Sequence, residues 1–302
     1  MSDLKTSCPQ DLKTSRPQDL KPPDLNYTDL VPRPVVNFGF SSCPNDTFAF
    51  HALVHDLVEG PRVIPHIDDI EALNVRASSN AAEVTKVSIS AYGYSLRDRF
   101  ILLRAGGAAG FGVGPIVVAR QQRAVGGRIA IPGERTTANL LLRLLGRFET
   151  VAMRFDQIED AVLRGDVDCG LLIHEGRFTF EQKGLTLLVD LGTVWEERMK
   201  CPLPLAAIAI RRDLAPALAA SVDAGLRGSV EYAFAHPEAS RDYVASLAQE
   251  MDPQVAARHI QLYVNDYTRA LDETAVKKML EWGAREGVFP AADEALPLFT
   301  AR

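Results

Sequence analysis

The hydrophobic pattern of the chain changes at about residue 35, where short apolar runs begin to alternate with stretches of helical periodicity. Apolar runs bounded by turn residues predict strands at 35–40, 62–67, 84–90, 100–104, 115–120, 128–133, 151–155, 168–174 and 205–210. Apolar residues at i, i+3, i+4 and i+7 predict helices from about residue 45 and at 70–78, 136–148, 156–165, 213–235, 237–250, 253–264 and 273–286. This alternation predicts an α/β fold with mostly parallel sheets.

The first predicted helix follows a turn directly after the first strand. Pro44 disfavours helical backbone at Cys43, so the helix should begin near Asn45 or Asp46, and either side chain could cap it. Its apolar stripe is formed by Phe50, Leu53, Val54 and Leu57. In α/β folds, ligands bind beyond the carboxyl ends of strands, so this turn is one place where a site is expected.

Residues 1–33 carry an imperfect repeat instead, DLKTSCPQ, DLKTSRPQ and DLKPPDL. The segment is rich in proline and poor in bulky apolar residues, so it cannot bury a core of its own. We predict a disordered tail. The opening MSDLKTSCPQDLKTS has no apolar region of the kind found in secretory signals, so we expect a cytoplasmic protein.

Composition and charge narrow the classes of function. The chain has 302 residues, of which 47% are apolar and 24% charged. These values are typical of a globular protein, and the length suggests two domains. The formal charge of −6, without a Lys/Arg-rich run, argues against nucleic acid or an anionic membrane as partner. No apolar run approaches the roughly 20 residues of a membrane span. The four cysteines are far apart, which argues against a disulfide framework or a thiolate zinc site.

Polar side chains gather in the turn SSCPNDT at 41–47. Ser42, Asn45 and free backbone N–H groups could converge there on an anion or a carbonyl. Ordinary helix capping accounts for the same residues, and both interpretations stay open. Cys43 could be a nucleophile, but no base lies near it in the sequence, which disfavours that hypothesis.

His174 ends the predicted strand DCGLLIH, where a cleft would open. Histidine is the usual general base near neutral pH, so His174 is the candidate base, with a packed structural histidine as the alternative. Glu175 follows directly. Adjacent strand residues face opposite sides, so one of the two should miss the cleft if the strand continues.

The segment GERTT at 133–137 links a predicted strand to a predicted helix. A glycine that allows close approach, followed by the hydroxyls of Thr136 and Thr137, suits a carboxylate or a hydroxyl-rich ligand. Helix capping is the alternative. Ser88 and Asn265 are further polar candidates.

Two other patterns favour structural interpretations. His51 and His55 have the i, i+4 spacing of zinc proteases, but the catalytic glutamate of that motif is missing, so a packed or solvated helix face is favoured over a metal site. The glycine-rich run 106–114 lacks the GxGxxG register and leads into a strand, which disfavours dinucleotide binding. We interpret it as a crossover between domains.

Longer blocks of the sequence resemble a known enzyme family. GFSSCPNDTFAFHALVH at 39–55 resembles the opening signature of the 1,4-dihydroxy-6-naphthoate synthases of the futalosine route to menaquinone. The similar blocks that follow, over about 35–270, are DIEALN, TKVSISAYG, GVGPIVVAR, PGERTTANLLL, GLLIHEGRFTF, DLGTVWEE, PLPLAAIAIRRDL and YVNDYT. Ser42 stands where the family more often has proline, and Gly176 where it is expected to have serine.

The resemblance implies a two-lobed type II periplasmic-binding-protein-like fold with a ligand cleft between the lobes. It implies a lyase that converts cyclic dehypoxanthine futalosine to 1,4-dihydroxy-6-naphthoate and releases the former ribose carbons as a small fragment. His174 carries over as the catalytic base. Thr136 and Thr137 carry over as substrate-binding residues, and the polar pattern described above adds Ser42, Asn45, Ser88 and Asn265 to the expected substrate-binding set. No metal or organic cofactor is implied, and the expected partner is a small-molecule substrate.

The lobes should be interleaved along the chain. Crossings at the glycine-rich run and near 204–210 predict one lobe from 34–112 and 208–302 and another from 113–207, after the tail at 1–33. Two rival interpretations are chorismate dehydratase of the same pathway and a non-catalytic solute-binding protein. Since solute-binding proteins work outside the cytoplasm, the opening of the chain argues against the second. The oligomeric state does not follow from the sequence.

Overall fold

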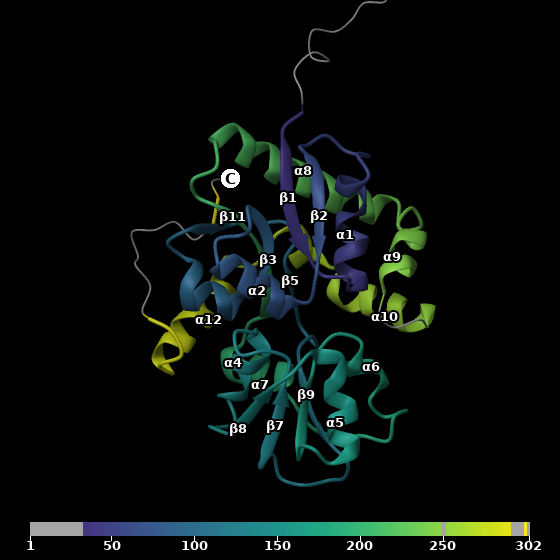
Figure 1. Ribbon diagram of the computed structural model, residues 1–302, viewed down its shortest axis with the longest axis vertical. Helices are drawn as coiled ribbons and strands as arrows, with labels where there is room; N and C mark the ends of the chain where they lie inside the picture. The colour runs from purple at the N-terminus through teal and green to yellow at the C-terminus, as the bar shows by residue number, and fades with distance from the viewer. Residues whose placement is uncertain (1–32, 249–251, 291–298, 301–302) are drawn as a thin grey trace, which may run out of the picture. The chain divides into compact units, whose positions relative to one another are not determined.

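The computed structural model describes residues 33–248, 252–290 and 299–300 (Figure 1). The predicted disordered tail at 1–33 lies outside the described residues, apart from Arg33. None of the helices in the described part of the chain is long and apolar enough to cross a membrane.

The first sheet is built from strands at 35–110 and from one later strand at 203–211. Its path runs β2 (Arg62–Ile67), β1 (Val35–Phe40), β3 (Val84–Ser88), β11 (Leu203–Arg211) and β4 (Phe100–Leu102), and β5 (Ala108–Gly110) also pairs with β11. β1 is parallel to β2 and β3, whereas β11 is antiparallel to β3, β4 and β5.

The second sheet comes from the middle of the chain. Its order is β10 (Thr186–Asp190), β6 (Ile116–Ala119), β9 (Cys169–Leu172), β7 (Arg128–Ile131) and β8 (Glu149–Ala152). β7 is parallel to β8 and β9, and β6 is antiparallel to β9 and β10.

Both sheets are therefore mixed, and the expectation of mostly parallel sheets was wrong. The continuous apolar runs that suggested parallel strands reflect burial on both faces, which an internal antiparallel strand also requires. β11 shows this, because it is apolar throughout Leu205–Ile210 and lies between β3 and β4, antiparallel to both.

Helices cover the first sheet with apolar faces. α1 (Pro44–Val54) and α8 (Pro216–Ala235) pack against each other, and α1 lies beside β2 in Figure 1. Their buried side chains share a core with β1 and β11, formed in part by Phe38, Phe40, Phe50, Leu53, Ile208 and Leu226. The rings of Phe38, Phe40 and Phe50 pack with centroids 5.1–5.4 Å apart. This apolar packing anchors the start of α1, where the candidate site begins.

A second core connects the C-terminal helix to the second sheet. Trp195 of α7 (Leu191–Met199) contacts Trp282 of α12 (Glu273–Arg285), with ring centroids 5.7 Å apart. On the other face of the second sheet, α5 (Ile158–Arg164) packs Ile158 and Val162 against β6 and β9. The remaining helical segments are α2 (Ile70–Ser78), α3 (Ile89–Ala91), η2 (Tyr92–Leu96), α4 (Thr137–Leu142), η3 (Phe155–Gln157), α6 (Gly176–Thr179), α9 (Arg241–Leu247), α10 (Pro253–Tyr263) and α11 (Asp266–Arg269).

Some helix boundaries differ from the predictions. α1 begins at Pro44 with Cys43 in the N-cap position, because proline is favourable in the first helical turn, where its missing N–H costs nothing. Asn45 and Asp46 lie inside the helix and do not cap it. α1 ends at Val54, so Leu57 lies beyond it and is 46% exposed. α4 ends at Leu142, shorter than the predicted 136–148.

The chain passes between the two sheets twice. The glycine-rich run 106–114 contains β5 and leads to β6, and the chain returns in β11. Since β11 begins at Leu203, the predicted boundary between 207 and 208 falls inside this strand.

Candidate functional site

One cavity collects most of the candidate residues. It encloses about 620 Å³, including space at the mouth that is open to solvent. Its wall draws on strands of the first sheet and on segments that adjoin strands of the second. The polar residues along it are Ser41, Asn45, Lys86, Ser88, Thr136, Thr137, His174, His259 and Tyr263.

A buried ion pair contributes one of its residues, Lys86, to the wall of the cavity. Lys86, in the middle of β3, pairs with Asp46 in the first turn of α1, and their side chains are 6% and 1% exposed. The Asp46 carboxylate also accepts hydrogen bonds from the Ser41 N–H at 3.1 Å and the Ser41 hydroxyl at 2.6 Å. Buried charges need this degree of compensation, and it fixes the start of α1 relative to β3.

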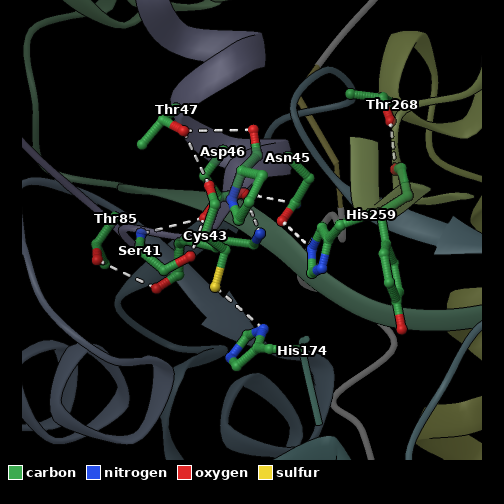
Figure 2. Close-up of polar contacts among 12 residues, drawn as sticks. Ser41, Cys43, Asn45, Asp46, Thr47, Thr85, His174, His259 and Thr268 are labelled. Atoms are coloured by element: carbon green, nitrogen blue, oxygen red, sulfur yellow. Dashed lines mark hydrogen bonds and ion pairs between the residues drawn. The ribbon is translucent and has the colours of Figure 1, made fainter. Parts of the chain in front are cut away.

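Cys43 contacts His174 at the centre of Figure 2, with 3.1 Å between Sγ and Nδ1. Burial, reinforced by the negative charges of Glu175 and Asp46, holds the pKa of the Cys43 thiol well above its ordinary value. Removal from water, followed by the positive charge of Lys86, lowers the pKa of His174 to about 4. Both groups are therefore neutral at pH 7, and a thiolate–imidazolium pair is not formed.

His174 is placed by its backbone. It lies just past the carboxyl end of β9 with a left-handed φ of 54°, an unusual conformation for a residue other than glycine. Its Nε2 atom is buried and has no hydrogen-bond partner among the described residues. Because the strand ends at Leu172, the alternation expected for His174 and Glu175 does not apply, and of the two only His174 lines the cavity.

A second histidine lies beside the first. His259 of α10 is 1% exposed, and its ring centroid lies 6.4 Å from that of His174. Its Nε2 lies 3.0 Å from the Asn45 side-chain oxygen, as Figure 2 shows. The Asn45 amide in turn donates to Asp46 over 2.9 Å. Asn45 thus links His259 to the buried ion pair.

Thr136 and Thr137 line the cavity, but protein groups use their hydroxyl protons. Thr136 is the N-cap of α4, where its Oγ1 accepts from the Asn139 N–H and donates to the Gly133 carbonyl. The Thr137 hydroxyl donates to the Leu205 carbonyl of β11 over 2.7 Å. Both capping and a place in the cavity wall are therefore found at this turn.

Of the remaining predicted residues, Ser88 lies along the cavity and two others do not. Ser88 accepts from the Asn74 amide over 3.0 Å. Ser42 lies next to the cavity-lining Ser41 and is not itself part of the wall. Asn265 caps α11, and its amide donates to the Ala109 carbonyl over 2.9 Å. Its side chain therefore joins α11 to β5.

Gly133 gives room to a neighbouring side chain of the protein. Its φ is +152°, and a Cβ there would lie 2.4 Å from Cγ of Glu71. The glycine thus leaves room for the Glu71 side chain, which accepts from the Arg135 N–H.

No group of His, Cys, Asp and Glu within the described residues is arranged to hold a metal ion. The rings of His51 and His55 pack against each other in a tilted arrangement with centroids 4.5 Å apart, and Tyr243 packs beside them. This packing agrees with the interpretation of a packed helix face.

Sequence reasoning missed Lys86 and His259 as site residues. Lys86 left a signal, since a single charge inside the apolar strand VTKVS is expected to be paired. His259 left none, because a histidine on an amphipathic helix is ordinary. Its partner Asn45 lies 214 positions away in the sequence.

Comparison with known proteins identifies relatives over most of the chain. A protein-family model described as "Menaquinone biosynthesis" matches residues 36–285. A 1,4-dihydroxy-6-naphthoate synthase of Thermus thermophilus is 45% identical over 271 residues, covering 87% of this chain and 98% of the relative. A protein of the same name from Streptomyces coelicolor is 45% identical over 270 residues, covering 85% and 95%.

Solved structures agree with the fold. A crystal structure of an Archaeoglobus fulgidus protein is 39% identical with a TM-score of 0.81, covering 84% of this chain and 98% of the other. The periplasmic aliphatic sulphonate binding protein of Escherichia coli is 11% identical with a TM-score of 0.62, covering 89% and 92%. That likeness shows the fold alone, and it confirms the predicted periplasmic-binding-protein-like architecture. Since the family match spans most of the sequence, the chain belongs to the menaquinone-biosynthesis family.

Proposed function

We propose that the chain is a 1,4-dihydroxy-6-naphthoate synthase, a lyase that converts cyclic dehypoxanthine futalosine to 1,4-dihydroxy-6-naphthoate. The observation that carries the proposal is a neutral His174 on the cavity wall, with its buried Nε2 free of hydrogen bonds to the described residues. Relatives of that name, 45% identical over most of the chain, support the same assignment.

The chemistry needs a base more than a cofactor. When a base removes a hydroxyl proton from the substrate, the O–H electron pair forms a carbonyl while the adjacent carbon–carbon bond breaks. The electrons of that bond pass into the ring system, and formation of an aromatic ring drives the step. A positioned general base contributes about 10²–10⁴-fold to such a reaction.

The contact between Cys43 and Nδ1 of His174 leaves Nε2 as the nitrogen that can act as the base. For Nε2 to accept a proton, Nδ1 must carry the imidazole's own proton, and the acceptor next to it is the Cys43 sulfur at 3.1 Å. Cys43 is then a positioning residue that holds the required tautomer. The neutral thiol suits this role, because a thiolate would draw a second proton onto the imidazole.

The cavity wall supplies groups of different hydrogen-bonding character. Ser88 accepts from Asn74, and its own hydroxyl proton remains available for a substrate oxygen. Thr136 and Thr137 have donated their protons to protein carbonyls, so they can only accept. We assign all three to substrate binding. In this assignment the cleft lies between two lobes, and the second lobe ends before Leu203 because β11 belongs to the first sheet.

The test is incubation of the purified protein with cyclic dehypoxanthine futalosine and detection of the naphthoate product. His174→Ala should lower kcat by at least about a hundredfold, because general base catalysis is lost. His51→Ala, at a residue that is not part of the cavity wall, is the control and should retain activity. Turnover of His174→Ala within about threefold of wild type would remove His174 from the mechanism.

A parallel incubation with chorismate separates the sister activity. The proposal predicts no consumption of chorismate by the wild-type protein. A protein that binds either compound without turnover would instead be a binding protein with the same fold.

A further inference from the structure

The His259 ring lines the same cavity as His174. The mechanism proposed for His174 assigns no role to His259. It is 1% exposed, and its Nδ1 atom is buried without a hydrogen-bond partner among the described residues. A buried imidazole nitrogen left unpaired is costly unless a ligand pairs with it.

The surrounding contacts fix the tautomer of His259. The Asp46 carboxylate, ion-paired with Lys86, can only accept, so the Asn45 NH₂ group must face it. The Asn45 oxygen then faces His259 and can only accept, so Nε2 of His259 carries a proton and donates it. Removal from water, followed by electrostatic interaction with the neighbouring His174 and with the positive Lys86, holds the pKa of His259 well below its ordinary value. In this neutral ring Nδ1 is therefore a lone-pair acceptor.

We propose that His259 binds the substrate directly, its Nδ1 accepting a hydrogen bond from a second hydroxyl of the ribose-derived ring. This assignment rests on the proposed function. The two histidines stack with centroids 6.4 Å apart, a spacing that suits two hydroxyl groups on one small ring. His174 then removes a proton from one hydroxyl while His259 holds the other in place. His259 is a specificity residue for a substrate with hydroxyl donors at both positions.

Two amide variants separate the two nitrogens of His259. His259→Asn places an amide oxygen near the position of Nδ1 and keeps the acceptor, whereas His259→Gln reaches toward Asn45 and keeps only the Nε2-like donor. We expect His259→Asn to retain kcat/KM within about threefold and His259→Gln to lose roughly tenfold or more, mainly through KM. Equal losses in the two variants, or wild-type kinetics in His259→Gln, would overturn the assignment.

A second measurement keeps His259 intact, so its result does not depend on whether the His259 variants fold. In His174→Ala, which should bind substrate without consuming it, the ¹⁵N resonance of His259 Nδ1 should shift on addition of cyclic dehypoxanthine futalosine, as expected for a nitrogen that gains a hydrogen bond. An unchanged resonance at saturating substrate would count against the contact. Wild-type protein that forms no naphthoate would overturn the proposed function, whereas wild-type turnover with an unshifted resonance overturns the His259 contact alone.

Discussion

The Cys43 side chain contacts His174, yet burial keeps the thiol protonated, so it has little nucleophilic character at neutral pH. Cys43 therefore contributes to the site through its contact with Nδ1 of His174. A nucleophile and a positioning residue differ in how they tolerate substitution, which makes the two roles separable.

Cys43→Ala should lower kcat by about tenfold with little change in KM, because Nδ1 of His174 loses its hydrogen-bond partner. Cys43→Ser keeps a hydrogen-bonding group and should stay within about threefold of wild type. Steady-state kinetics of the two variants decide the matter. If both variants were inactive while folded, Cys43 would have to act as a nucleophile.

All candidate residues that the sequence identified, except Asn265, end or follow a strand, where topology alone predicts a site. His174, Ser88, Thr136, Thr137 and Asn45 all reach the cavity wall. Their partners could not be predicted, because the contacts join residues far apart in sequence, as Cys43 and His174 do over 131 positions. Hydrophobic periodicity carries no information about such pairings.

Among the helices, α7 shows how local sequence and tertiary packing act together. Asp190 caps α7 by accepting from the Gly192 and Thr193 N–H groups. The same turn packs against the segment before β6, where Leu191 donates to the Pro115 carbonyl. A Cβ on Gly192 would lie 1.9 Å from the Val113 carbonyl oxygen. This glycine is therefore required by close backbone approach and not by its φ.

Gly192→Ala should destabilise the protein by about 2 kcal/mol or more, since backbone has to move to relieve the clash. Gly228→Ala in α8 is the matched control. A Cβ there meets only Val58 at ordinary distances of 3.6 Å and beyond, so alanine should be neutral or stabilise by about 0.5–1 kcal/mol. Urea unfolding of both variants measures the difference. Equal stability of the two would contradict the packing described for α7.

Helices and strands were predictable from the sequence where their buried residues recur with the helical or the strand period. β1, β2 and α2 match their predicted ranges because each begins and ends at clear turn or capping residues. α4 ends at Leu142, although Leu144 beyond it is still buried. The apolar periodicity therefore continues past the end of the helix, because side chains beyond it still pack in the core. Strand direction was not predictable, since burial on both faces produces the same apolar run in either orientation.

For the molecule as a whole, the two cavity histidines predict how stability depends on pH. In the unfolded chain they bind protons below about pH 6.5, whereas the folded pKa of His174 is about 4 and that of His259 is also lowered. Between these values the unfolded state holds more protons than the folded state. The free energy of unfolding should therefore fall as the pH is lowered from about 6.5 to about 4, by up to about 1.4 kcal/mol per pH unit for each histidine.

His259→Gln should reduce this slope, because it removes one titrating group. Tyr263→Phe alters the neighbouring ring, 4.6 Å from His259, without removing a group that titrates in this range, and should keep the wild-type slope. Chemical unfolding of the two variants and the wild type, at several pH values between about 4.5 and about 7.5, measures the three slopes. This interval brackets roughly the pH range in which an ordinary histidine titrates. A slope that is the same in both variants and in wild type would contradict a neutral buried His259.

The interleaved sheets also impose an order on folding during synthesis. All strands of the second sheet lie between Ile116 and Asp190, so this sheet can be completed while the chain is still being made. β3 needs β11 on one of its edges, and β11 is synthesised after the whole second sheet. Until then the apolar edge of β3 stays open, which is the usual route to intermolecular pairing of nascent chains. Substitutions that slow the docking of β11 should therefore lower the yield of folded protein in the cell, even where the completed protein is as stable as the wild type.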